Sequence, residues 1–300
     1  MITSTIISYG GWKRCLRIAN GSLELVVTLD VGPRIIRCAL IGDKNLFVEY
    51  PDQMGKTAGD AYHSYGGHRL WIAPEEKPKT YFPDNRPVEW IQDAEWFHVR
   101  PPAETSGFQK EINIRLDSEN ARVRVLHRIS NVSKAPVTAS VWALSVMAPG
   151  GTAIFPHEPF QPHPDRLLPV RPLVFWSYTE MTDPRWAWGK RYIQLTQSDA
   201  KNPQKIGAFN SLGWAAYLNE DRLFLKRFPA HTDATYPDFG CNCEIFTNHR
   251  MLEVESLGPL RSIAPGESLT HEEQWFISKA GRRGDTEEEL QSIIEPALTP

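Results

Sequence analysis

Short apolar or alternating runs separated by turn residues recur along the whole chain, and they restrict it to a mainly β fold. The first runs are residues 15–18, 23–29 and 34–40. Asn20 and Gly21 lie between the first two and predict a two-residue hairpin turn, because both residues tolerate positive φ. Further strands are predicted at residues 88–99, 108–116, 122–130, 137–146, 192–196, 214–218, 222–228, 243–246, 251–257 and 271–277. At least a dozen strands, punctuated by 24 prolines, predict an all-β fold.

Helical periodicity is confined to the end of the chain. Thr286 and Glu289 form a capping-box pattern, which predicts a short helix over about residues 285–296 that stops before Pro296. Residues 52–87 and 149–172 are rich in turn residues and are predicted to be irregular. Neither segment separates halves of different composition, so we expect one domain over residues 1–300.

Composition excludes several classes of partner. The formal net charge of the 300 residues is -3 with both signs mixed, so no basic stripe predicts binding to nucleic acid or to an anionic membrane. No apolar run approaches the length of about 20 residues that crosses a bilayer, and no leader-like start is present, so a cytoplasmic protein is expected. The oligomeric state stays open.

No cofactor or metal is expected from the sequence. Its four cysteines are too few for a disulfide framework, and Cys241 and Cys243 lack the usual two-residue spacing of zinc ligands. Phosphate-cradling and dinucleotide-binding motifs are also absent. A small-molecule ligand bound without a cofactor is therefore the expectation.

Two glutamates occupy one strand near the end of the chain. In an extended strand Glu253 and Glu255 point the same way, with Cα atoms roughly 6.6 Å apart. One interpretation is a site on that face. The other is an edge strand whose outer face is exposed to solvent.

The chain resembles the galactose mutarotase-like superfamily, which includes aldose 1-epimerases. The resemblance is carried by residues 20–25 leading to Gly32-Pro33-Arg34-Ile35, by residues 127–133, and by Leu252-Glu253-Val254-Glu255 followed by residues 265–267 and Trp275. Residues 65–75, 176–178 and 236–240 resemble, more closely, a bacterial family of this superfamily known mainly as a domain of unknown function. The implied fold is a galactose mutarotase-like β-supersandwich of mostly antiparallel strands.

The resemblance implies acid–base chemistry at a sugar ring. In the mutarotases a glutamate takes the proton of the anomeric hydroxyl and a histidine protonates the ring oxygen. The position of the base corresponds to Glu253, whereas the strand aligned with that histidine, residues 141–148, contains none. His157 or His68 is then the candidate acid, with an ordinary surface or loop histidine as the alternative.

Other residues are expected to hold the sugar. Arg69 and His68 are predicted to lie in a loop after Gly66 and Gly67, beside Trp71. There the arginine guanidinium can donate hydrogen bonds to sugar hydroxyls. The alternatives are an ion pair of Arg69 with Glu75 or Glu76, and a hydrogen bond of His68 inside the loop.

The remaining candidates lie elsewhere along the chain. Arg34 and Glu255 are further lining residues, and Asp238 could bind a hydroxyl or stabilise its own turn. Trp176 belongs to an aromatic group with Tyr178, Trp186 and Trp188 that could stack on a sugar or pack under a loop.

These observations favour a carbohydrate-active protein, of the type of an aldose 1-epimerase-like isomerase with Glu253 as its base. Because residues 141–148 contain no histidine, a second interpretation is that the same pocket binds a carbohydrate without turnover. A glycoside hydrolase or lyase fits less well, because two glutamates on one strand face do not flank a scissile bond.

Overall fold

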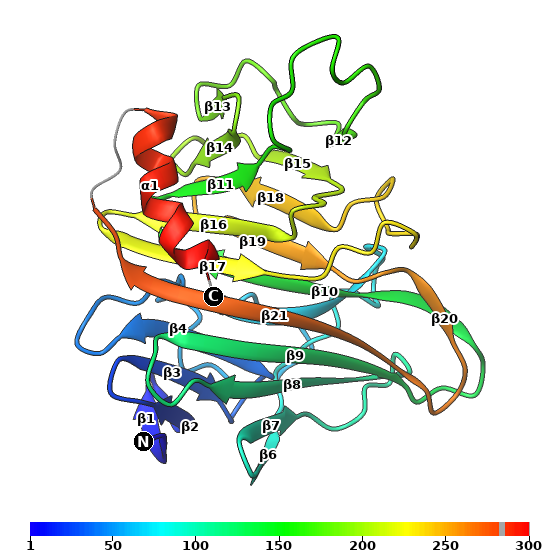
Figure 1. Ribbon diagram of the computed structural model, residues 1–300. Helices are drawn as coiled ribbons and strands as arrows, with labels where there is room; N and C mark the ends of the chain where they lie inside the picture. Colours follow the sequence, from blue (N-terminus) through cyan, green and yellow to red (C-terminus); the bar gives the residue numbers. More distant parts are fainter. Residues whose placement is uncertain (282–285, 300) are drawn as a thin grey trace.

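Two large antiparallel sheets and one C-terminal helix make up the computed structural model, which describes residues 1–281 and 286–299 (Figure 1). The eleven-stranded sheet has the order β1-β2-β3-β4-β5-β10-β19-β18-β15-β12, with β20 paired to β10. The ten-stranded sheet has the order β13-β14-β11-β16-β17-β21-β9-β8-β7-β6. The predicted all-β sandwich with a short C-terminal helix is confirmed.

The eleven-stranded sheet consists of β1 (Thr3–Tyr9), β2 (Trp12–Ala19), β3 (Leu23–Thr28), β4 (Arg34–Leu40), β5 (Gly67–Ala73), β10 (Val137–Met147), β12 (Leu173–Phe175), β15 (Gln204–Ala208), β18 (Cys243–Thr247), β19 (Leu252–Leu257) and β20 (Arg261–Ile263). The ten-stranded sheet consists of β6 (Glu89–Asp93), β7 (Trp96–Arg100), β8 (Phe108–Leu116), β9 (Arg122–Asn131), β11 (Thr152–Pro156), β13 (Trp186–Trp188), β14 (Tyr192–Thr196), β16 (Trp214–Asn219), β17 (Arg222–Arg227) and β21 (Ser268–Lys279).

Most predicted strands are present, and β8 and β14 have the predicted bounds. The run at 88–99 divides into the hairpin β6 and β7, whose turn contains Ala94 at φ 39°. Two segments predicted to be irregular contain strands, because β5 lies within residues 52–87 and β11 within 149–172. Every residue of both strands is buried. A strand covered on both faces carries no period-two pattern, so neither could be recognised.

The hairpin at Asn20 forms, but its turn differs from the predicted one. Neither Asn20 nor Gly21 has a positive φ. Instead, the Asn20 side-chain oxygen accepts hydrogen bonds from the backbone N–H groups of Ser22 and Leu23, at 2.8 and 2.7 Å. The turn is therefore held by an asparagine side chain that replaces a backbone acceptor.

The C-terminal helix α1 (Glu287–Leu298) begins with the predicted capping box between Thr286 and Glu289. The predicted start at residue 285 lies outside the described residues. The predicted stop before Pro296 is wrong, because the helix includes this proline in its last turn, where one missing N–H removes a single hydrogen bond. Leu290 and Ile294 pack on the outer side of the ten-stranded sheet (Figure 1). No helix among the described residues is long and apolar enough to cross a membrane.

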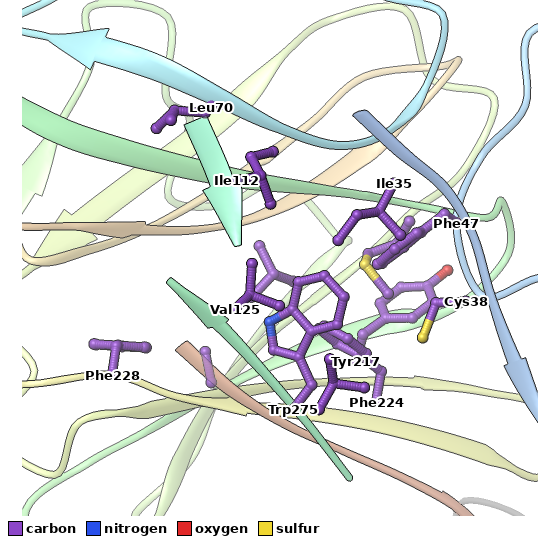
Figure 2. Packing of buried hydrophobic residues seen from close by; sticks show 14 of the residues in the cluster. Ile35, Cys38, Phe47, Leu70, Ile112, Val125, Tyr217, Phe224, Phe228 and Trp275 are labelled. Carbon is purple, nitrogen blue, oxygen red and sulfur yellow. The ribbon is translucent and has the colours of Figure 1, made fainter. Parts of the chain in front are cut away.

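The main hydrophobic core fills the space between the two sheets. Figure 2 shows the indole of Trp275 (β21) among these side chains. Its ring centroid lies 5.6 Å from that of Phe47 and 5.4 Å from that of Phe224, both in edge-on contact. Close packing of rigid aromatic rings fixes the distance between the sheets, and with it the position of each strand face.

A charged pair is buried inside this core and joins the two sheets. Glu273 on β21 is fully buried, and its Oε1 accepts hydrogen bonds from Lys226 Nζ at 2.7 Å and from Ser256 Oγ at 2.6 Å. Its Oε2 accepts one from Trp275 Nε1 at 2.8 Å. Lys226 Nζ also donates to the carbonyl oxygen of Ala143 on β10. Glu273 is thus fully satisfied by both sheets, as burial of a carboxylate requires.

Three buried histidines continue this network. His127 Nδ1 lies 3.0 Å from a backbone carbonyl oxygen and must donate to it, so its Nε2 accepts from His68 Nε2 at 2.7 Å. His68 Nδ1 then accepts from Ser145 Oγ at 3.0 Å. His271 Nε2 donates to Ser256 Oγ at 2.7 Å, since that hydroxyl donates to Glu273. Both ring nitrogens of His68 and of His127 are therefore satisfied in the neutral form.

Replacing Lys226 by methionine should strongly destabilise the fold. The substitution leaves Glu273 charged and unpaired between the sheets, which typically costs about 3–5 kcal/mol. Urea denaturation of Lys226→Met measures the loss. The matched control Lys44→Met removes a lysine that is exposed in its ion pair with Glu220, so its midpoint should stay near that of wild type. Equal midpoints for both variants would contradict a structural role for the buried pair.

Stability should also fall at acidic pH because of the buried histidines. Burial lowers the pKa of His68 and His127, and that of His271 to about 3. The unfolded chain therefore binds more protons below about pH 6.5, and each histidine contributes a loss of up to about 1.4 kcal/mol per pH unit until its folded pKa is reached. Urea denaturation between pH 7 and pH 5 tests this. His271→Gln should reduce the slope, and a slope equal to that of wild type would contradict this account.

Candidate functional site

Strand alternation brings charged side chains together on the outer face of the eleven-stranded sheet. Six charged residues from five strands between β4 and β15 lie on this face, and we call them the outer charged face: Arg34, Arg69, Glu253, Glu255, Glu244 and Lys205. Their neighbours along each strand, such as Ile35, Leu70 and Val254, point into the core between the sheets. All six members are buried, so each charge needs a partner.

Strand register sets the order of this face. Arg69 on β5 is aligned with Leu144 on the central strand β10, which is aligned with Glu255 on β19 and then with Glu244 on β18. Glu253 and Glu255 share one face, as predicted. The alternative of a wet edge strand does not hold, because β19 lies between β10 and β18 and both glutamates are buried.

Glu253 is paired with Arg69. Arg69 Nη2 donates to Glu253 Oε1 at 2.7 Å, and the side chains are 3% and 8% exposed. The guanidinium also lies 4.5 Å from the ring centre of Trp71, a cation–π contact. The partner of Arg69 is thus Glu253 and neither Glu75 nor Glu76. Burial raises the pKa of Glu253 in spite of the attraction by Arg69.

Glu255 and Glu244 share one lysine. Lys205 Nζ lies 2.6 Å from Glu244 Oε2 and 3.2 Å from Glu255 Oε2. Its ammonium is also 4.8 Å from the ring centre of Trp142 and 4.6 Å from that of Trp176. Burial disfavours this charge, but the two carboxylates outweigh burial and the pKa of Lys205 is raised well above its ordinary value. Lys205 therefore stays protonated between the two carboxylates.

Asp238 belongs to the same group. It lies in the loop after Pro237 with φ 51°, where the charges of the two carboxyls of Asp238 and Glu244 act on each other. Burial raises the pKa of both carboxyls, and the charges of Glu255 and Glu75 add to the effect on Asp238. Asp238 therefore faces Glu244 in addition to shaping its turn.

Aromatic residues surround the charges. Tyr62 and Tyr81 lie against Trp71, with ring centroids 5.6 and 4.9 Å away, and Trp71 meets Trp142 edge-on at 5.3 Å. Trp142 Nε1 donates to Glu255 Oε2 at 2.8 Å. Half-exposed Tyr178 covers the Lys205 end, where its neighbours are Lys205 and the nearby glutamates.

Several buried polar atoms on this face have no hydrogen-bond partner in the described part of the chain. The donors are Trp71 Nε1, Tyr62 OH and Arg69 Nε, and Arg34 Nε and Nη2; the acceptors are Glu255 Oε1 and Glu244 Oε1. Orphaned buried groups are costly and mark positions where a ligand or water completes the hydrogen bonds.

Arg34 is the outermost member of this face. It is aligned with Arg69 across β4 and β5 and is fully buried. Its Nη1 donates to the Gly66 carbonyl oxygen at 2.9 Å, and its Nη2 lies 3.8 Å from Asp84. Arg34 therefore borders the face with part of its donor capacity unused.

The two histidines proposed as the acid lie elsewhere. His68 is on β5 rather than in a loop, and alternation points it into the core, opposite to Arg69. His157 follows β11 of the ten-stranded sheet, and its charged neighbours are Arg171, Glu158 and Glu287. On β10 the outward side chains include Trp142 and Leu144, so Leu144 lies in line with Arg69 and Glu255.

The sequence reasoning missed Lys205 and Trp142. Lys205 lies on β15, a five-residue strand that the sequence did not predict. The only signal for the role of Lys205 was the presence of one lysine between Gln204 and Ile206. Trp142 was placed on the correct strand without a role. Of the predicted aromatic group, Trp176 reaches Lys205, whereas Trp186 and Trp188 stack on each other in β13.

A metal ion has one candidate location in the described residues. Ligand atoms of His68, His127 and Glu273 lie within 4.8 Å of one another. Their hydrogen bonds are complete without an ion, and Lys226 already neutralises Glu273. A divalent ion would add its charge beside Lys226 in the core, so these residues do not fit one well.

Comparison with known proteins gives the fold. No protein-family model matches the chain, and no curated protein matches its sequence. A solved structure from Klebsiella pneumoniae, with a proposed aldose 1-epimerase activity, is 12% identical and has a TM-score of 0.62 over 99% of this chain and 86% of that one. A galactose mutarotase-like protein from Lactobacillus casei is 8% identical, with a TM-score of 0.55 over 88% and 100%.

The same sandwich also occurs inside a larger protein. A TPR-domain containing protein from Parabacteroides distasonis is 13% identical, with a TM-score of 0.56 over 88% of this chain and 47% of that one, so this chain spans about half its length. At these identities the likeness concerns architecture and not chemistry. This chain has the galactose mutarotase-like β-sandwich fold.

Proposed function

We propose that the outer charged face binds a carbohydrate and interconverts its anomers. One observation carries the proposal: buried Glu253 and Glu255 point to the same side, held by Arg69 and Lys205, while nearby donors and acceptors lack partners. Sugars present hydroxyls that both donate and accept, together with apolar ring faces suited to aromatic side chains. Trp71 and Trp142 supply such a surface.

Anomer interconversion needs a base at the anomeric hydroxyl and an acid at the ring oxygen. In this proposal Glu253 is the base, because burial raises the affinity of its carboxylate for a proton while Arg69 fixes its position. Asp238, whose pKa is raised by burial, supplies the acid in place of a histidine. Lys205, held between Trp142 and Trp176, orients Glu255.

A binding protein without turnover is the second candidate. It is supported by Leu144, which presents no proton donor in line with Arg69 and Glu255 on the central strand. In that case a sugar would bind in calorimetry, and the rate of anomer exchange would equal that of buffer. The two candidates are distinguished by exchange rates in the same samples that show binding.

Glu253→Gln should abolish catalysis while leaving the fold intact. The amide keeps the shape of the side chain but cannot accept the anomeric proton, and general acid–base catalysis typically contributes about 100- to 10,000-fold. NMR exchange spectroscopy of a panel of aldoses measures the rate. The control Glu272→Gln changes a partly exposed glutamate on β21 that pairs with Arg124 on the neighbouring strand β9 of the ten-stranded sheet, and its rate should match wild type. Acceleration that survives Glu253→Gln would refute its role as the base.

A further inference from the structure

The two ends of the outer charged face differ in the hydrogen-bonding atoms that they leave free. At the end near β4 and β5 every atom without a partner in the described residues can donate a hydrogen bond, from Arg34, Arg69, Trp71 and Tyr62. At the end formed by β18 and β19 they are acceptors, Glu244 Oε1 and Glu255 Oε1, on side chains with no exposed surface. A ligand therefore meets a donor end and an acceptor end.

The acceptor end also carries an excess of negative charge. Four carboxyl groups lie there, Glu244, Glu255, Asp238 and the exposed Glu75, and Lys205 is the only cation among the described residues that forms an ion pair with Glu244 or Glu255. Lys205 can neutralise one of them. A ligand group entering between these carboxyls is attracted if it is a cation and repelled if it is an anion.

Arg69 and Lys205, two of the three cations of the face, are already engaged, whereas Arg34 keeps unused donors at the opposite end. Arg69 is bound to Glu253 at 2.7 Å, and Lys205 is bound to two carboxylates. A phosphate needs several free cationic donors converging on it, and such an arrangement is not found at the Lys205 end. The aromatic rings of Trp142 and Trp176, which already hold the ammonium of Lys205, are surfaces on which a second ammonium is also favourable.

We propose that the sugar bound by this face is an amino sugar, whose ammonium lies among Glu244, Glu255 and Asp238. Its ring oxygen and remaining hydroxyls then accept from Trp71 Nε1 and Tyr62 OH at the donor end. This inference rests on the proposed function, because it assigns a substrate class to the same face. It places the charged group of the ligand at the unpartnered carboxylate oxygens, where a neutral hydroxyl would form a weaker hydrogen bond.

Matched sugar pairs test this assignment by calorimetry on the full chain. The probes are D-glucose with D-glucosamine, D-galactose with D-galactosamine, and D-mannose with D-mannosamine, together with D-glucose 6-phosphate and D-glucuronate. In at least one pair the amino sugar should bind about tenfold more tightly than its parent, since a hydrogen bond to a charged group contributes about 1.4 kcal/mol more than a neutral one. The two anionic sugars should bind more weakly than glucose.

Two variants locate the preference. Glu244→Gln removes a buried charge and should reduce the affinity for the amino sugar to about the affinity for its neutral parent. The comparison is made once far-ultraviolet circular dichroism of the variant matches that of wild type. Glu75→Gln changes an exposed side chain, so it folds regardless, and it should lower the advantage by a smaller factor. Glu272→Gln should leave all affinities unchanged.

The outcomes separate the two proposals. Binding of neutral sugars with no preference for the amino forms, or tighter binding of the phosphate or uronate, would overturn the amino-sugar assignment and leave carbohydrate binding standing. An unchanged preference in both Glu244→Gln and Glu75→Gln would also overturn it. Absence of binding by every sugar would overturn the proposed function together with this inference.

Discussion

The central strands β5, β10 and β19 carry polar side chains on both faces, and the rest of the structure depends on how these are paired. On the inner face His68, Ser145 and Ser256 belong to the network around Glu273 and Lys226 that joins the two sheets. On the outer face the same strands present Arg69, Glu253 and Glu255. A shift of register by one residue would exchange the two sets, which fixes the pairing of these strands strongly.

The two faces meet this constraint differently. In the core, the histidines and Glu273 form their hydrogen bonds within one network. On the outer face Arg69 pairs with Glu253, and Lys205 lies between Glu244 and Glu255, yet donors at one end and acceptors at the other stay unpartnered. Burial of unsatisfied groups is unfavourable for folding alone, and such departures from complete satisfaction are typical of binding sites. This contrast between the faces is the reason why we propose the outer one as the binding site.

The sequence predicted the sandwich and the shared orientation of two glutamates on the outer charged face. The alternation Leu252-Glu253-Val254-Glu255 was enough to place both glutamates on one face, because a strand has a period of two. It was not enough for His68 and Arg69, since β5 is covered on both sides and shows no alternation. Lys205 could not be found at all, because its contacts with Glu244 and Glu255 join residues of β15, β18 and β19 that only the sheet order brings together. Long-range pairing is the part that local pattern does not encode.

The indole N–H signals of the tryptophans give the most direct test of a ligand on the outer face. Trp71 Nε1 has no partner there and Trp142 Nε1 donates to Glu255, whereas Trp275 Nε1 donates to Glu273 between the sheets. In a ¹H–¹⁵N spectrum titrated with sugar, the signals of Trp71 and Trp142 should shift together while that of Trp275 stays in place. A sugar that binds without moving either outer signal would contradict the assignment of the site to this face.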